Sequence, residues 1–176
     1  MSFTVLVGNP KSESRTLGVA SAAATAVARQ LSLDSGFDLV DLSVLARRLL
    51  LPEPSAAIED AVQQVLDADL LLVVSPTFKG TYSGLLKVFL DRLPYRALAG
   101  TTALPLMVMN SPQHALAVEV HLRPVLTELG ASVPAAGLAL LEADLDQLDG
   151  IVQRWSARVA DTIARLPVAP EPAMAS

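Results

Sequence analysis

The most informative run of the sequence is Leu70-Leu71-Leu72-Val73-Val74, which is followed by Ser75-Pro76. Five consecutive branched apolar residues without polar alternation are typical of a strand that is buried on both faces. Such strands belong to parallel sheets that carry helices on each side. We therefore predict a strand over residues 70–74, stopped by the serine and the proline, within an α/β protein.

Similar apolar runs recur along the chain and alternate with longer amphipathic segments. The pattern predicts strands over residues 3–7, 37–42, 70–74, 103–109 and 132–138, and helices over residues 16–31, 54–66, 83–93, 115–129 and 145–166. We expect Pro124 to kink the fourth helix or to limit its start. Five β units alternating with five α units indicate a doubly wound fold of three layers. The expected five-stranded parallel sheet has the flavodoxin-like order 2-1-3-4-5.

The length and composition favour one domain that associates with other copies. The chain has 176 residues, of which 52% are hydrophobic and only 18% are charged. So few charges suggest that some apolar surface is covered by another subunit, in a homodimer or a tetramer. The helix over residues 84–93 is apolar around most of its circumference and is the expected interface. We place the domain at residues 1–166 and a disordered tail at residues 167–176.

Several classes of function are disfavoured by the same composition. The net charge of −5, with scattered basic residues, argues against nucleic-acid binding. There are no cysteines and only two histidines, so we expect no metal site. The chain begins without a positively charged leader, and its longest aliphatic run is far shorter than the roughly 20 residues of a membrane span. We expect a cytoplasmic protein without a membrane segment.

Polar loops follow the predicted strands, at the edge of the sheet where doubly wound proteins bind ligands. In the first loop, Gly8 should allow a sharp turn, and the start of the next helix offers backbone N–H groups beside hydroxyls and cations. This combination suits a single terminal phosphate; the alternative is an ordinary helix cap with solvated charges. The candidate residues are Asn9, Lys11, Ser14, Arg15 and Thr16.

The second and third loops offer a platform for a flat ligand. Pro76 restricts the backbone and Gly80 allows it unusual angles. The N–H and C=O groups of the loop could then face the edge of an aromatic ring. The alternatives are hydrophobic packing for the two aromatics of this loop and a plain polar turn for the third loop. Ser83 is expected to cap the helix that follows. The candidates are Pro76, Thr77, Phe78, Lys79, Gly80, Tyr82 and Ser83, and then Asn110, Ser111, Gln113 and His114.

Together these loops resemble the NADPH-dependent FMN reductase family, which has a flavodoxin-like fold. The most specific likeness is the run Pro76-Thr77-Phe78-Lys79-Gly80-Thr81-Tyr82-Ser83-Gly84-Leu85-Leu86-Lys87-Val88-Phe89-Leu90-Asp91, in which Phe78 replaces a tyrosine of the family pattern. The resemblance implies that Ser14, Arg15 and Thr16 hold the FMN phosphate, with Asn9 and Lys11 nearby. It also implies that residues 76–80 carry the isoalloxazine, that Tyr82 and Ser83 flank it, and that the third loop closes the far side.

A finer likeness is to the reductases of two-component sulfonate monooxygenase systems. It rests on Leu104-Pro105-Leu106 and on the segment from Ala117 to Leu126. It implies that FMN is a substrate released in reduced form, and that an inserted residue at Val120 or His121 forms a π-bulge at a subunit interface. Hydride transfer from NADPH to FMN needs no catalytic side chain, because the flavin supplies the reactivity.

Three functions remain open from the sequence. The first is an NAD(P)H:FMN reductase that passes reduced flavin to a partner monooxygenase. The second is a tight-binding FMN oxidoreductase acting on quinones, azo compounds or metal oxyanions, and the third is a flavodoxin-like electron carrier without enzymatic activity. The sequence does not decide between NADPH and NADH, since it carries no readable selector for either cofactor.

Overall fold

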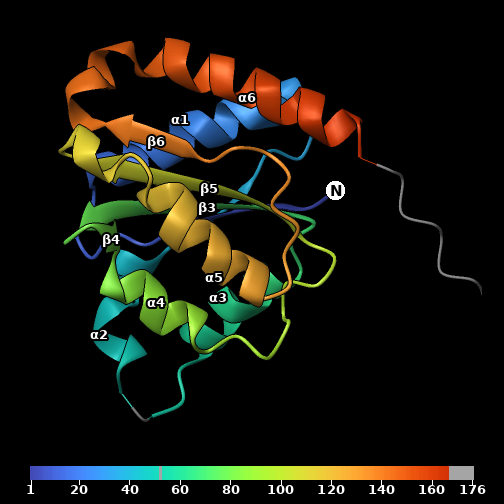
Figure 1. Cartoon of the computed structure of the whole chain (residues 1–176). Helices are drawn as coiled ribbons and strands as arrows, with labels where there is room; N and C mark the ends of the chain where they lie inside the picture. Colours follow the sequence, from blue (N-terminus) through green and yellow to red (C-terminus); the bar gives the residue numbers. More distant parts are fainter. Residues whose placement is uncertain (52, 167–176) are drawn as a thin grey trace, which may run out of the picture.

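A parallel sheet of five strands forms the middle layer of the molecule (Figure 1). The computed structural model describes residues 1–51 and 53–166; the expected disordered tail lies outside these ranges. In the order β2-β1-β3-β5-β6, the five strands are Asp38–Asp41, Phe3–Val7, Leu70–Phe78, Thr102–Met109 and Leu138–Leu141. Counted along the chain, this is the order 2-1-3-4-5, so the predicted doubly wound fold is confirmed.

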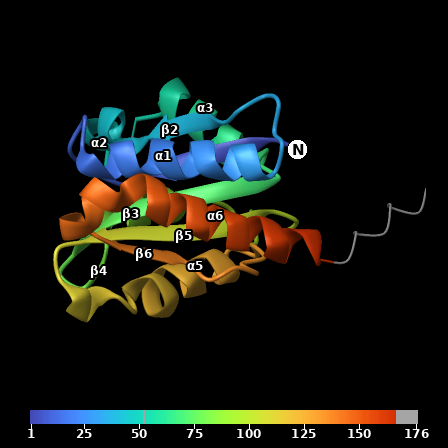
Figure 2. The ribbon, with the colours of Figure 1, turned by 90° about the horizontal axis from the view of Figure 1, so that it is seen from above.

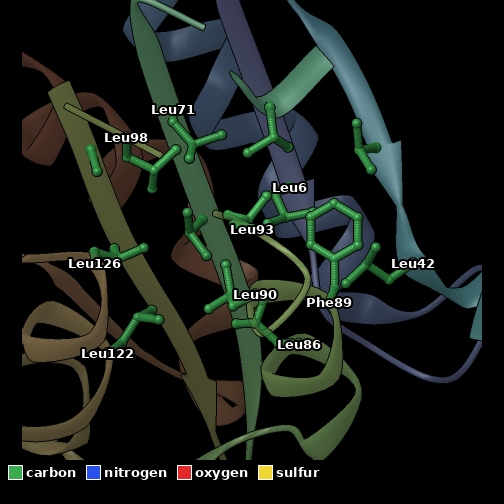
Figure 3. Packing of buried hydrophobic residues seen from close by; sticks show 14 of the residues in the cluster. Leu6, Leu42, Leu71, Leu86, Phe89, Leu90, Leu93, Leu98, Leu122 and Leu126 are labelled. Atoms are coloured by element: carbon green, nitrogen blue, oxygen red, sulfur yellow. The ribbon is translucent and has the colours of Figure 1, made fainter. Parts of the chain in front are cut away.

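Helices cover both faces of the sheet (Figure 2). Helices α1 (Arg15–Gln30) and α6 (Leu148–Ala164) pack on one face, where Trp155 is fully buried. Helices α3 (Ala56–Leu66), α4 (Gly84–Leu90) and α5 (Arg123–Glu128) cover the other face, and the short α2 (Ala46–Leu49) lies beside α4. Figure 3 shows the core of this second face, a single cluster that contains Leu6 of β1, Leu71 of β3 and Phe89 of α4. No helix of the described ranges is long and apolar enough to cross a membrane.

The central strand continues past the point where the sequence predicted its end. Strand β3 runs to Phe78, and Ser75 and Pro76 pair with Met107 and Val108 of β5. The carbonyl of Val74 accepts the N–H of Gly8 from the β1 side, so the backbone of Pro76 also points to that side. Strand β1 has already ended there, and the missing N–H of the proline therefore costs no hydrogen bond of the sheet.

The prediction for the last strand was wrong. In the predicted segment 132–138, Ser132 forms one isolated bridge with Thr102, and the continuous strand β6 begins only at Leu138. Pro134 follows closely after the bridge, and a proline cannot donate to a ladder. Strand β6 therefore ends at Leu141, three residues later than expected, and the next residue at the carboxyl edge is Glu142.

The predicted helix over residues 115–129 consists of a π-helix followed by a short α-helix. A 3-10 turn (Pro112–His114) precedes a π-helix (Val118–Leu122), which leads directly into α5. Pro124 lies in the first turn of α5, where its missing N–H is tolerated. The π-helix contains both Val120 and His121, where a π-bulge was predicted; its place at a subunit interface stays a prediction.

An ion pair ties the π-helix to the loop that precedes β6. Arg123 binds both carboxylate oxygens of Glu119, and its Nη2 also donates to the carbonyl of Ala135 at 2.7 Å. The backbone N–H of Gly137 donates to Glu119 Oε1 at 2.7 Å. The hydrogen bond from Arg123, with a further contribution from Gly137, lowers the pKa of Glu119. Arg123 thus binds the carbonyls of Val133 and Ala135, which are not part of a strand ladder.

Candidate functional site

The first loop folds against its own backbone before α1 begins. Ser14 is the N-cap of α1, and its hydroxyl accepts the N–H of Leu17 at 3.2 Å. The nearly buried Asn9 donates from Nδ2 to Thr16 Oγ1 at 2.8 Å and accepts the N–H of Lys11 at 2.9 Å. Asn9 therefore shapes the loop, while Lys11 and the helix start remain available to an anion.

A cavity of about 450 Å³ lies at the carboxyl edge beside this loop. It joins the loop after β1 with the projecting end of β3, so it lies where doubly wound folds place their ligands. Another hollow, of about 360 Å³, lies between α1 and α6 on the outer helical face. The residues that line the cavity at the edge are Asn9, Pro10, Lys11, Glu13, Ser14, Arg15, Thr16, Pro76, Phe78 and Glu142.

A hairpin projects from the sheet at the end of β3. The short strand β4 (Thr81–Tyr82) pairs antiparallel with Thr77 and Phe78. The two turn residues, Lys79 and Gly80, have φ angles of 53° and 85°, as a type I′ turn requires. Thr77 Oγ1 is buried and has no hydrogen-bond partner in the part of the chain that the structure describes. Such an unpaired hydroxyl fits a hairpin that contacts a polar ligand.

Ser83 anchors the base of this hairpin. Its N–H donates to Ser75 Oγ at 2.9 Å, and its hydroxyl donates to the carbonyl of Gly8 while accepting the N–H of Leu86 at 3.1 Å. The predicted cap of α4 is thus confirmed. The backbone N–H of Ser83 binds β3 and its hydroxyl binds the end of β1, so this residue joins the two strand ends. Because Ser83 is buried and its hydroxyl both donates and accepts a hydrogen bond, it supports the base of the hairpin.

Gly8 has a different role from the one that the sequence suggested. Its φ angle is not positive, so the turn itself does not require glycine. A Cβ at this position would lie 2.6 Å from Leu86 Cβ, which belongs to the fully buried face of α4. Glycine is needed because α4 packs directly against the backbone where the first loop begins.

The structure brings the first two loops together at one cavity. Seven predicted residues line the cavity: Asn9, Lys11, Ser14, Arg15, Thr16, Pro76 and Phe78. Thr77, Lys79, Gly80 and Tyr82 form the adjoining hairpin. The third loop follows β5 at the same edge but does not line the cavity; Ser111 caps its 3-10 turn, and Asn110, Gln113 and His114 are exposed or half-buried.

Three residues that line the cavity were not among the predicted ones: Pro10 and Glu13 of the first loop and, far away in the sequence, Glu142. The Oε2 of Glu142 lies 2.5 Å from Arg15 Nη1, so the cation expected to bind phosphate already holds a carboxylate. A signal existed, because residues that directly follow a parallel strand belong to the ligand-binding edge. The misplaced last strand concealed it, since the predicted end at Leu138 left Glu142 four residues outside.

Comparisons with known proteins agree with this geometry. The model of the family described as NADPH-dependent FMN reductase matches residues 1–146. An FMN reductase (NADPH) of Pseudomonas aeruginosa is 31% identical over 148 residues, which are 83% of this chain and 80% of the relative. The NADH-dependent FMN reductase SfnF of Pseudomonas fluorescens is 32% identical over 148 residues, 82% of this chain and 78% of the relative.

Solved structures lead to the same group. The apo form of an NADH:FMN oxidoreductase, EMOB, superimposes with a TM-score of 0.74 at 31% identity and covers 88% of each chain. An archaeal flavodoxin, with a TM-score of 0.63 and 13% identity over 94% of this chain and all of its own, supports the fold alone. With a family match over most of its length, this chain belongs to the NADPH-dependent FMN reductase family and is an NAD(P)H:FMN oxidoreductase.

Proposed function

We propose that this reductase binds FMN across the carboxyl edge of the sheet and releases it in reduced form to a partner monooxygenase. The observation that carries the proposal is the cavity between the first loop and the hairpin. Its helix start and cations suit a phosphate, and the neighbouring hairpin offers backbone groups and a free hydroxyl to a ring. The π-helix over Val118–Leu122, where the likeness to the sulfonate-system reductases implies one, supports release.

The residues of the chain divide the work of binding. Ser14 Oγ and the start of α1, with Lys11 and Arg15, would hold the phosphate, while Pro76, Thr77 and Phe78 would carry the ring. When bound, FMN supplies the chemistry by accepting a hydride at its ring system from reduced nicotinamide. Lys79 is exposed at the tip of the turn, where its positive charge could favour the reduced, more negative ring. We place the enzyme in the cytoplasm, where reduced nicotinamide cofactor is available.

Purification distinguishes release from retention. The protein is expressed, purified without added flavin, and examined by its absorbance near the flavin bands and by NADPH oxidation. We expect a colourless protein that oxidises NADPH or NADH only when FMN is added. A yellow protein with stoichiometric FMN would contradict release and favour the tight-binding oxidoreductase, and a yellow protein without NAD(P)H oxidation would favour an electron carrier.

We predict that replacing Arg15 with alanine weakens binding of FMN more than binding of riboflavin. A charge-assisted contact with the phosphate contributes about 1.5–3 kcal/mol to binding. Riboflavin lacks the phosphate, so its binding does not include this contact. Dissociation constants of both flavins are measured by quenching of flavin fluorescence. If the affinities for FMN and riboflavin fall equally, Arg15 does not contact the phosphate.

We further propose that the chain forms a homodimer or a tetramer. The apolar circumference of α4 is largely covered within the subunit, since Leu86, Phe89 and Leu90 are buried, but Leu85 and Val88 are only partly covered. On the same side of the sheet, Leu116 and Val120 are 70% and 55% exposed. Large apolar side chains exposed together mark association surfaces.

Light scattering tests the assembly. At micromolar concentration we expect the mass of a dimer or a larger assembly for the wild type. The variant Val120→Glu should shift the equilibrium toward smaller species, because an unpaired charge in an apolar interface is costly. A wild-type monomer under these conditions would refute the proposal.

A further inference from the structure

The ion pair between Arg15 and Glu142 lies inside the cavity proposed for FMN. Glu142 directly follows β6, the last strand of the chain, and is therefore distant from the first loop in sequence. Its carboxylate nevertheless contacts the guanidinium of Arg15 at 2.5 Å. Both residues line the cavity. The side chain of Glu142 is 31% exposed, whereas that of Arg15 is 69% exposed. The carboxylate is thus the better fixed partner, and the arginine is the one free to turn.

The charges that line the cavity cancel. Lys11 and Arg15 are cations, whereas Glu13 and Glu142 are carboxylates. A phosphate monoester near pH 7 carries between one and two negative charges, and a lining without surplus positive charge holds it weakly. Glu142 also forms an ion pair with Arg15, the cation that would otherwise face the phosphate, and this weakens the site further.

From this arrangement we infer that Glu142 determines how tightly the enzyme holds FMN. Binding of the phosphate must draw Arg15 away from Glu142 or share it, and the carboxylate then lies beside a like charge. Both effects lower the affinity for FMN and speed its departure. The affinity for riboflavin should be independent of Glu142. The inference rests on the proposed function, since it concerns FMN in the same cavity.

The test compares Glu142→Gln with a matched control, Asp146→Asn. Glutamine keeps the shape of the side chain and removes its charge; Asp146 lies on the same 3-10 segment, is exposed, and is not part of the cavity lining. We expect the dissociation constant of FMN, measured by fluorescence quenching, to fall on the order of fivefold to twentyfold in Glu142→Gln. Riboflavin binding and the Asp146→Asn variant should stay within about twofold of wild type.

Two further measurements assign the mechanism. The gain of Glu142→Gln should shrink at high salt, because exposed charges are then screened. It should also shrink in an Arg15→Ala background, where no ion pair has to be broken. Stopped-flow mixing of reduced FMN complexes should show slower release from Glu142→Gln than from wild type.

The contrary outcomes are distinct. Weaker FMN binding by Glu142→Gln would overturn the inference, because Glu142 would then orient Arg15 toward the phosphate. Equal tightening by Asp146→Asn would also overturn it, because overall charge would suffice as the explanation. A wild-type protein that neither binds FMN nor oxidises NADPH in its presence would instead contradict the proposed function itself.

Discussion

Gly8→Val is expected to lower the free energy of unfolding by about 3 kcal/mol, in the upper part of the range for overpacked cores. Already the first side-chain carbon would lie 2.6 Å from Leu86 Cβ. That atom is attached to the backbone of α4 and has no freedom to turn away, so the helix must move. Gly8 also holds Val74 through its N–H and Ser83 through its carbonyl, so the displacement reaches both loops of the cavity. FMN affinity should fall together with stability, as measured by urea unfolding and fluorescence quenching.

Gly18→Ala provides the control for this experiment. Gly18 lies inside α1, and a Cβ there would meet no atom within 4 Å. Alanine should stabilise the helix by about 0.5–1 kcal/mol relative to glycine. If Gly8→Val unfolds at the same urea concentration as wild type, α4 does not pack against the first loop as described.

Gly80→Val is expected to reduce FMN-dependent NADPH oxidation about 100-fold, the loss that a displacement of about 1 Å can cause at a reacting centre. The φ angle of Gly80 is 85°, a region that a β-branched residue avoids. Valine would therefore reshape the turn, and the register of Thr77 with Tyr82 and of Phe78 with Thr81 would change with it. Stopped-flow bleaching of bound flavin by saturating NADPH measures the effect, while circular dichroism should show an intact fold.

Gly36→Val separates backbone strain from the role of the hairpin. Gly36 has a φ angle of 70°, has open space around it, and lies just before β2, at the opposite edge of the sheet. The same backbone strain should lower the free energy of unfolding of Gly36→Val and of Gly80→Val by about 1–2 kcal/mol each. Only Gly36→Val should retain its activity. Gly80→Asn should recover part of the activity, because asparagine tolerates this backbone region. Full activity in Gly80→Val would exclude the hairpin from the flavin site.

The sequence was sufficient for the layers, the strand order and the edge that carries the site. Buried strands such as residues 70–74 have no polar alternation, and polar loops follow them directly. Local chemistry also predicted the cap at Ser83, because a serine before an apolar helical run has few other roles.

Other features depend on contacts between distant segments and leave no local signal. Ser75-Pro76 has the composition of a strand end. These two residues nevertheless belong to β3, because β5 extends beyond the end of β1 and continues to pair with them. The apolar residues near Val133 have the composition of a strand, but Pro134 and the carbonyls bound by Arg123 make this segment a loop. The Arg15–Glu142 pair joins residues 127 positions apart, which no pattern within either segment could indicate.

That long separation also bears on the order of events during synthesis. The wall of the cavity combines a loop near the amino terminus, the end of β3 and a residue that follows the last strand. Contacts between distant segments require closure of a long chain loop, so they form late in folding. The pocket is therefore incomplete on a nascent chain until β6 has joined the edge of the sheet. Flavin would select the finished domain, and its binding free energy would stabilise only chains that have completed the sheet.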